Sequence, residues 1–491
     1  MIAFASNPVN YSNLFAITLP ETILEVVSLL ALIVDLAWLR RSSQAVRMAW
    51  ACALGVLGCA ASAAWLAAHP SVPALDGNIL VATPLVAAAQ IGILVLSALV
   101  LVLSFKAEFS RNPGEFSAIV LLATTGMLLV AAARDLQVIF VALELLSLSL
   151  YVLTAFAKRS AQSAEAALKY YLFGGMSAAI MLFGFSYLYG LTGTTSLEGI
   201  AASLAAQPLS PLLIVAFVLV SAGLGFKVAA VPFHLWAPDT YQGAPAPVTA
   251  LIASGSKVAS FAVLVALTSA IIPPDAPLHA ASWAVLLLWM AAGSIILGNL
   301  AALVQTSVRR LLAYSAIAHA GYMLLGIAAN TPQSGAAVLY YALTYALTTV
   351  GVFGIIGIVE RSAGTDRMDA FAGLSRRNPL LAATMFLFLL SLAGIPPLVG
   401  FWAKFNLFAA VLRAGSLGMS GLILVAAAVA ASAVSLYYYL QVMKRMYVFK
   451  PVRLEPMPVS FVELATLALI ALAVLALGIF PAALSNWIPL G

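Results

Sequence analysis

The sequence predicts an all-α protein that crosses a membrane about fourteen times. Of its 491 residues, 64% are hydrophobic and only 8% are charged, whereas a soluble domain typically carries about 25% charged residues. Apolar runs of roughly 20 residues, long enough to cross a ~30 Å hydrocarbon layer as a helix, recur from end to end. No long polar stretch is present that could fold as a separate soluble domain.

Polar loop residues divide these runs into predicted spans. The spans cover residues 13–39, 46–68, 80–105, 116–133, 136–157, 164–191, 209–243, 246–272, 282–304, 311–329, 335–359, 380–412, 418–443 and 459–484. The seventh and twelfth are too long for one straight helix and contain the interruptions "AAVPFHLWAP" and "AGIPPLVG". Breaks inside a bilayer persist only where protein or water satisfies the freed backbone groups. Helices 7 and 12 are therefore predicted to be broken, at Pro232 in one and at Pro396 and Pro397 in the other.

The distribution of Lys and Arg predicts the orientation, because cytoplasmic loops carry an excess of both. Loops and helix ends that follow odd-numbered spans hold 18 of these residues, against only Arg134 and Arg413 on the other side. The 18 are Arg40, Arg41, Arg47, Lys106, Arg111, Lys158, Arg159, Lys169, Arg309, Arg310, Arg361, Arg367, Arg376, Arg377, Lys444, Arg445, Lys450 and Arg453. Both termini are expected on the non-cytoplasmic side of a bacterial inner membrane. The net charge of +6 then reflects topology and gives no reason to expect nucleic acid; segment 234–246, which has no Lys or Arg, is discordant.

Three cations remain, and all three fall inside predicted spans: Lys227, Lys257 and Lys404. A charged side chain there costs at least ~2.5–3.5 kcal/mol and by default marks an ion or proton path. Snorkelling to the surface is the structural alternative. Lys257 lies ten residues after Pro247, ~15 Å along a helix, which is too deep for easy escape.

Glu144 is the natural counter-ion of these lysines. It lies eight residues past Leu136 in the fifth span, ~12 Å along the helix. A lone carboxylate there would take up a proton, but beside an ammonium it can stay charged. A Glu–Lys pair whose members can be separated acts as a proton switch, because separation changes the proton affinity of both. The alternative is a static ion pair between helices.

The tenth span contains a candidate relay. Ser315, His319 and Tyr322 follow each other at spacings of four and three residues and therefore share one helix face. Histidine titrates nearest neutral pH and suits proton transfer, although a buried histidine often only bonds two helices together. His234, in the first break, could either transfer protons or cap freed backbone carbonyls.

The first span carries Glu21, Glu25 and Asp35. Glu21 and Glu25 are four residues apart and are expected on one face near the end of the helix. We expect them at an interface or a subunit contact, and the sequence assigns them no definite role.

The two broken spans are five spans apart, which predicts an internal repeat. Because five is odd, the second copy would be inverted across the membrane, as in many ion-coupled transporters. The predicted parts are an N-terminal three-helix segment (1–110), a first repeat of helices 4–8 (111–275), a second, inverted repeat of helices 9–13 (276–450) and a C-terminal helix 14 (451–491). Identity between the halves is slight, so the matched breaks carry the argument.

Four stretches point to a known family: "GLGFKVAAVPFHLWAPDTYQGAPAPV", "ELLSLSLYVL", "RRLLAYSAIAHAGYMLLG" and "LSLAGIPPLVGFWAKF". Together they closely resemble the antiporter-like subunits of bacterial NADH–quinone oxidoreductase (respiratory complex I), and subunit N in particular. The resemblance covers nearly the whole chain and is weakest in spans 1–3 and 14. A lysine at position 404 favours subunit N over subunit M, and the chain lacks the lateral helix of subunit L.

The resemblance implies a fourteen-helix subunit of the proton-pumping membrane arm. By motif, Glu144 and Lys227 match the paired groups on helices five and seven, Lys257 the lysine on helix eight, His319 the linking histidine, and Lys404 the terminal group. It implies no redox centre in this chain: flavin and iron–sulfur clusters belong to partner subunits, and NADH and quinone are substrates of the whole complex. The implied partners are other membrane-arm subunits, including a neighbouring antiporter-like subunit, and membrane lipids.

We therefore expect a proton-translocating subunit of an enzyme of the translocase class. Protons would pass through Glu144, Lys227, Lys257, His319 and Lys404, driven by quinone reduction elsewhere. Two alternatives remain: a subunit of a multi-subunit cation/proton antiporter, and a scaffold that conducts nothing.

Overall fold

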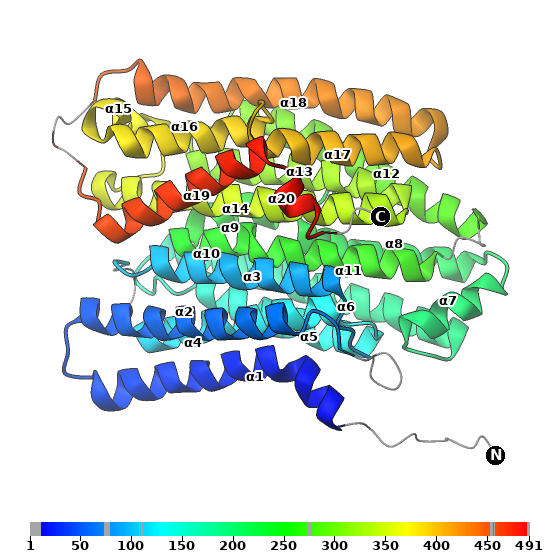
Figure 1. The fold of residues 1–491 in the computed structure, drawn as a ribbon. Coiled ribbons are helices and arrows are strands. Elements are labelled where there is room, and N and C mark those ends of the chain that lie inside the picture. The colour runs from blue at the N-terminus through cyan, green and yellow to red at the C-terminus, as the bar shows by residue number, and fades with distance from the viewer. Residues whose placement is uncertain are drawn as a thin grey trace.

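The computed structural model describes residues 11–72, 79–107, 109, 111–272, 277–451, 455 and 457–488. In these residues the chain is almost entirely helical and has no β-strand, only isolated bridges. Thirteen helical stretches are long and apolar enough to cross a membrane, and a shorter apolar helix begins the broken twelfth span. The prediction of an all-α polytopic membrane protein is thus confirmed. In Figure 1 the long helices lie side by side in one bundle, with α1 along one edge and α18 along the opposite edge.

The first half of the bundle contains six continuous membrane helices. The elements are α1 (Tyr11–Ile33), its π-helical continuation η1 (Val34–Trp38), α2 (Gln44–Ala68), α3 (Pro84–Leu103), α4 (Pro113–Ala132), α5 (Leu136–Thr154), α6 (Ala161–Thr192) and the short α7 (Leu197–Ala205). Side chains at the starts of these helices accept hydrogen bonds from the first free N–H groups, as Ser43, Thr83 and Asp135 do. Such caps fix where each helix begins.

The second half contains all the broken helices. The elements are α8 (Pro211–Val228), α9 (Trp236–Gly243), α10 (Ala246–Ala253), α11 (Gly255–Ile271), α12 (Pro277–Leu303), α13 (Val308–Ala329), α14 (Pro332–Ala363), η2 (Met368–Phe371), α15 (Leu374–Arg377), α16 (Pro379–Ala393), α17 (Val399–Ala414), α18 (Gly418–Tyr447), α19 (Phe461–Ile479) and α20 (Ala482–Ser485). The seventh span is α8 and α9, and the twelfth is α16 and α17, so both expected breaks are present. A third break, between α10 and α11, was not predicted, and neither was α7, which is too short to span a membrane.

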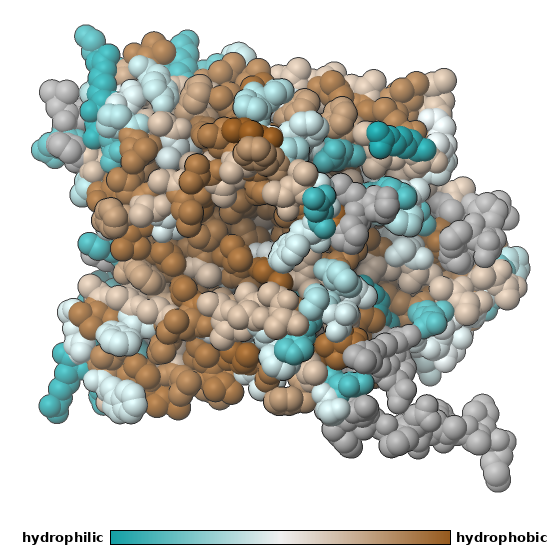
Figure 2. All heavy atoms as spheres, in the orientation of Figure 1, coloured by the Kyte–Doolittle hydropathy of each residue, from teal (hydrophilic) through white to brown (hydrophobic). Residues whose placement is uncertain are grey.

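The surface of the bundle has the distribution of apolar and hydrophilic side chains expected of a membrane protein. Figure 2 shows apolar side chains across the middle of this face and hydrophilic ones gathered toward the ends of the helices. Large apolar residues point outward from α1, α12 and α18, for example Leu29, Trp289 and Ile423. Lipid or neighbouring subunits can cover such a face without cost, whereas water cannot.

The acidic residues of α1 do not share one environment. Glu21 is buried, and its Oε1 lies 3.4 Å from Nε2 of Gln90 on α3, whereas Glu25 is exposed on the outer face. The expectation that Glu21 and Glu25 lie together at an interface is therefore wrong for Glu21, because α1 turns that residue toward α3. Asp35 is buried and forms an ion pair with Arg47 at 2.6 Å.

Helix α13 lies in the centre of the bundle and is buried along almost its entire length. Its closest partner is α12, and the two helices approach each other at Gly298 of α12 and Gly321 of α13. A Cβ added at Gly298 would lie 2.6 Å from the nitrogen of Ala318 and 2.8 Å from the oxygen of Tyr314. Small residues allow such close backbone packing between membrane helices.

Replacing Gly298 by alanine should destabilise the protein, because the added methyl group must push α12 away from α13. Overpacking of this kind costs about 1–3 kcal/mol. We expect Gly298→Ala to lower the temperature at which the solubilised protein aggregates, as measured by size-exclusion chromatography of a tagged chain. Gly175→Ala on α6 is the matched control, because nothing lies within 4 Å of its added Cβ. Equal stability of the two variants would contradict this packing.

Candidate functional site

Glu144 and Lys227 face each other across α5 and α8. Oε1 of Glu144 lies 4.0 Å from Nζ of Lys227, whose side chain is only 7% exposed. The lysine donates its hydrogen bond to Oγ of Ser147, and this hydroxyl donates to the carbonyl of Leu143. Ser147 follows Glu144 by three residues and shares its helix face. The ammonium is thus held by a hydroxyl, with the carboxylate slightly farther away.

The same region contains polar atoms without partners. Among the described residues, Oε1 of Glu144 and the hydroxyl of Tyr151 are buried and form no hydrogen bond. Buried polar groups are normally paired with protein or with ordered water. The face of α5 that contacts Lys227 therefore carries two polar groups, on Glu144 and Tyr151, to which a water molecule could bond.

The break after Lys227 is held open by protein groups. Helix α8 ends one residue after Lys227, and Ala229 takes a left-handed conformation with φ of 59°. Nε1 of Trp236 then donates at 2.9 Å to the carbonyl of Phe226, which also accepts from the N–H of Ala229. Pro232 lies in this break, as predicted from the sequence. His234 lies there too, buried, with no partner for Nδ1 in the described part of the chain.

Lys257 lies immediately after the break that the sequence analysis missed. Helices α10 and α11 meet at Ser254, where φ is −117° and ψ is −91°. Two residues beyond the start of α11, Nζ of Lys257 donates to the carbonyl of Ala316 on α13 at 2.9 Å. The signal for this break was the run "SGS" directly before the lysine, since Ser and Gly both favour irregular backbone over helix.

His319 forms the centre of a hydroxyl network. Its Nδ1 lies 2.7 Å from the hydroxyl of Tyr341, and its Nε2 lies 3.4 Å from that of Tyr439. Tyr439 also bonds to Ser315, with 2.5 Å between the two hydroxyl oxygens. A hydroxyl both donates and accepts hydrogen bonds. Each ring nitrogen therefore has a partner in either tautomer.

Two tyrosine rings connect His319 to the lysines on both sides. The ring of Tyr345 lies 4.8 Å from that of His319, and Nζ of Lys257 lies 5.8 Å from the same tyrosine ring. The ring of Tyr322 lies 5.7 Å from His319, with Nζ of Lys404 at 5.6 Å from it. A cation within about 6 Å of an aromatic ring is attracted to its face. Lys257, His319 and Lys404 thus form one continuous buried row.

Lys404 caps the helix that the twelfth break interrupts. Its Nζ donates to the carbonyls of Leu392 and Ala393, at 3.0 and 2.8 Å, and to Oγ of Ser432 at 2.7 Å. Both carbonyls end α16, where oxygens lack partners within the helix and the helix dipole favours a cation. Gly394, with φ of +87°, gives the ammonium room, because a Cβ there would lie 3.2 Å from Nζ. Pro396 and Pro397 then separate α16 from α17.

A small cavity lies between His319 and this break. It has a volume of about 10 Å³, and its lining residues are His319, Tyr341, Thr344, Tyr345, Thr348, Ser391, Leu392, Gly400 and Ala403. About 10–15 Å³ is the least that holds one water molecule. A single water in this position would have polar partners from α13, α14 and α16.

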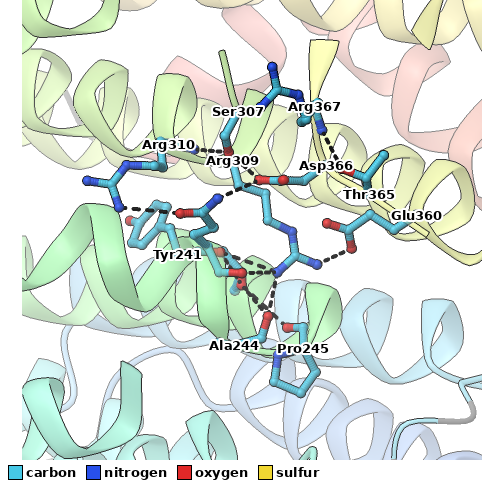
Figure 3. A network of polar contacts seen from close by, with 12 residues as sticks. Tyr241, Ala244, Pro245, Ser307, Arg309, Arg310, Glu360, Thr365, Asp366 and Arg367 are labelled. Carbon is cyan, nitrogen blue, oxygen red and sulfur yellow. Dashed lines mark hydrogen bonds and ion pairs between the residues drawn. The ribbon is translucent and has the colours of Figure 1, made fainter. Parts of the chain in front are cut away.

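The segment without Lys or Arg receives its cations from other helices. Lys169 on α6 and Arg310 on α13 both pair with Asp239 of α9, at 2.8 and 2.5 Å. Figure 3 shows Arg309 reaching the chain just after α9. The sequence placed Arg309 among the loop cations, but its side chain is only 5% exposed. It is a fourth buried cation in the described part of the chain.

Four residues of this network were not predicted from the sequence to belong to the site: Ser147, Tyr341, Tyr345 and Tyr439. Ser147 could have been found, because it lies three residues after Glu144 on the same helix face. Tyr341 and Tyr345 are spaced by four in "YALTY", but such a pair also suits an ordinary apolar core. Tyr439 has no local signal at all.

The Glu144–Lys227 pair and the row together contain amines, hydroxyls, one carboxylate and one imidazole, all of which can exchange protons. Cys52 and Cys59 on α2 are buried and free. In the described ranges, no three His, Cys, Asp or Glu side chains gather as metal ligands would.

The chain matches known membrane proteins along most of its length. Residues 133–432 match the transmembrane family described as NADH:quinone oxidoreductase/Mrp antiporter. NADH-quinone oxidoreductase subunit N 2 of Acidobacterium capsulatum is 48% identical, over 98% of this chain and all of that one. The F(420)H(2) dehydrogenase subunit N of Methanosarcina mazei is 42% identical over 76% of each chain.

Solved structures show the same fold. A chain of respiratory complex I from Thermus thermophilus is 33% identical, with a TM-score of 0.78, and the match covers 96% of this chain and all of that chain. A chain of the Mrp complex from Dietzia is 22% identical with a TM-score of 0.81, over 96% and 97% of the two chains; at this identity the likeness concerns the fold alone. The chain therefore belongs to the family of antiporter-like membrane subunits that NADH–quinone oxidoreductases and Mrp antiporters share, and within it to the subunit N proteins of respiratory complex I.

Proposed function

We propose that this chain translocates protons across the membrane through its row of buried ionisable groups. The observation that carries the proposal is the continuous series of contacts from Lys257 through Tyr345, His319 and Tyr322 to Lys404. Burying cations is costly, and a scaffold gains little from it. A chain of groups that can each hold or pass a proton offers a reason for that cost.

In this proposal Glu144 controls the proton affinity of Lys227. When the carboxylate is close, it stabilises the charged ammonium; when it is drawn away, the lysine releases its proton more readily. Because Ser147 holds Nζ of Lys227, the lysine need not leave its place when the carboxylate moves. At 4.0 Å from Nζ of Lys227, the carboxylate of Glu144 lies between the two arrangements, one close to the lysine and one drawn away from it.

The proposed order begins with a half-channel that leads to Lys227 and Lys257. His319 then passes the proton to Lys404, and the small cavity beside His319 is the place for a water that takes part in this transfer. From Lys404 the proton would leave toward water or a neighbouring antiporter-like subunit. His234, Ser315 and Tyr322 would support the transfer by hydrogen bonding.

The driving reaction takes place in other subunits of the complex. We propose that NADH oxidation and quinone reduction, with their flavin and iron–sulfur clusters, belong to partner chains, and that this chain contributes proton transfer to an enzyme of the translocase class. The excess of Lys and Arg after odd-numbered spans supports an orientation with both termini on the non-cytoplasmic side of a bacterial inner membrane. The matched breaks in the seventh and twelfth spans support two inverted repeats, 111–275 and 276–450.

Replacing Lys227 or Lys404 by methionine should abolish coupled pumping. Methionine fills a similar volume but holds no proton, so the complex should still assemble. The measurement is the number of protons pumped per NADH oxidised in membrane vesicles, with assembly checked on native gels. Unimpaired pumping in both variants would contradict the proposed proton relay and would favour a scaffold that conducts no protons.

Ser147 gives a finer test of the Glu144–Lys227 pair. Ser147→Ala removes the acceptor of the lysine's hydrogen bond, and bonds to charged groups contribute about 1.5–3 kcal/mol. We expect proton transfer about tenfold slower or more, measured as the rate of vesicle acidification at constant NADH supply. Ser147→Thr keeps the hydroxyl and should retain most of the rate; equal rates for both variants would contradict a role of the hydroxyl.

The rival assignment is a subunit of a cation/proton antiporter, because the family match is shared with Mrp antiporters, but the 48% identity with a subunit N protein favours complex I. Purification of the native assembly separates the two. A complex I assembly brings flavin and iron–sulfur absorbance with this chain and oxidises NADH with quinone, whereas an antiporter brings neither.

A further inference from the structure

Arg309 is buried but lies outside the row of lysines and His319. Figure 3 shows its guanidinium between α14 and the linker that joins α9 to α10. Nη1 donates to the carbonyl oxygens of Tyr241 and Gln242, at 3.3 and 3.1 Å, and to that of Ala244. Nη2 forms an ion pair with Glu360 on the last turn of α14. One side chain at the start of α13 therefore connects three elements.

The hydroxyl of Thr249 also donates to two of these carbonyls, those of Tyr241 and Ala244, at 3.2 and 3.5 Å. The three carbonyls end α9, where oxygens have no partner within the helix. Pro245 and Pro247 follow directly, and proline has no N–H to donate. The planar guanidinium can serve several acceptors at once, which a lysine ammonium does less well.

The linker joins the two broken helices that carry the first two lysines. At one end, Trp236 of α9 donates to the carbonyl of Phe226, the residue before Lys227. At the other end, α10 leads into the break before Lys257, which itself bonds to Ala316 on α13. Arg309 and Ala316 are seven residues apart, about two turns of the same helix. Helix α13 thus holds both the linker and Lys257.

The linker also has space beside it. A cavity of about 670 Å³ adjoins it, and Pro245, Ala246, Arg309 and Glu360 are among the lining residues. Protein interiors are otherwise closely packed. Arg309 therefore holds the linker on the side of this cavity, whereas on another side Gly243 packs closely against Ala166 of α6.

We propose that Arg309, with Glu360 as its counter-ion, is a positioning residue for proton transfer between Lys227 and Lys257. It fixes the linker and with it the relative placement of the two broken helices that carry these lysines. The second set of contacts, from Arg310 and Lys169 to Asp239, holds α9 by its other face. The proposal rests on the proton-translocating function proposed above.

The test compares Arg309→Lys, Arg309→Met and Glu360→Gln in the complete complex. Assembled complexes of these variants should oxidise NADH at near wild-type rates but pump fewer protons per NADH. Residues that act through coupling change it by about 0.5–2 kcal/mol, so we expect a fall of about 2- to 30-fold in the rate of coupled transfer, smallest for Arg309→Lys. Arg445→Gln is the matched control, because it removes an ion pair with Asp369 that is largely exposed.

A double variant separates positioning from simple stability. Replacing both members of a buried ion pair with apolar residues often leaves a protein as stable as before, whereas removing one leaves an unpaired charge. Arg309→Met with Glu360→Met should therefore restore assembly if a single variant lowers it. If Arg309 positions the linker, pumping per NADH stays low in the double variant; if the pair only stabilises the fold, pumping returns with assembly.

Lys227→Met, measured in parallel, keeps the two proposals apart. Loss of pumping in Lys227→Met with wild-type pumping in every assembled Arg309 and Glu360 variant overturns the positioning role alone. Full pumping in both Lys227→Met and Lys404→Met overturns the proton relay itself. Where Arg309→Met and the double variant do not assemble, Arg309→Lys and Glu360→Gln, which keep side-chain size and hydrogen-bonding ability, decide the matter.

Discussion

The cost of holding an ammonium group away from water is the constraint on which this structure depends. Moving such an ion into a low-dielectric interior costs several kcal/mol even after the protein relaxes. Each of the three buried lysines meets that cost with acceptors on a neighbouring helix. The acceptor is a serine hydroxyl for Lys227, a carbonyl of α13 for Lys257, and the carbonyls at the end of α16 for Lys404. Lys404 is satisfied most fully, since all three of its donors have partners.

A helix break supplies the acceptors of Lys404, and the breaks in turn need support. The carbonyls of an intact membrane helix already bond within the helix, and that of Ala316 on α13 accepts from Lys257 in addition; a break leaves backbone groups without helical partners. The breaks at Pro232 and Gly394 expose such groups, and side chains from other helices satisfy those that the lysines do not use. Around the seventh and eighth spans, Trp236 and Arg309 donate to carbonyls, and Oγ of Ser294 accepts from the N–H of Val231. The polar groups of the interior are therefore connected across helices, with α13 in contact with most of them.

Sequence reasoning placed the buried lysines, Glu144 and His319, because each is a rare ionisable residue within an apolar run. It also located two of the three breaks, since proline marks a break directly. It missed the break at Ser254, where only small residues interrupt the helix. It also missed Tyr345 and Tyr439, since an aromatic residue in an apolar helix is most often part of the core. Arg309 was misplaced because a position at a helix end does not reveal whether the side chain points toward water or inward.

The sequence by itself determined that this protein is a bundle of membrane helices, that the spans containing Pro232 and Pro396 are broken, and that Lys227, Lys257 and Lys404 lie within apolar runs. Composition and hydrophobic run length fix these features, because the bilayer imposes the same length and polarity on every span. Only the tertiary structure decided which side chains meet. Three features depend on contacts between residues far apart in the chain. They are the hydrogen bond from Lys227 to Ser147 beside Glu144, the tyrosines around His319, and the linker bound by Arg309. Helical periodicity specifies the face on which a residue lies, but not which helix packs against that face.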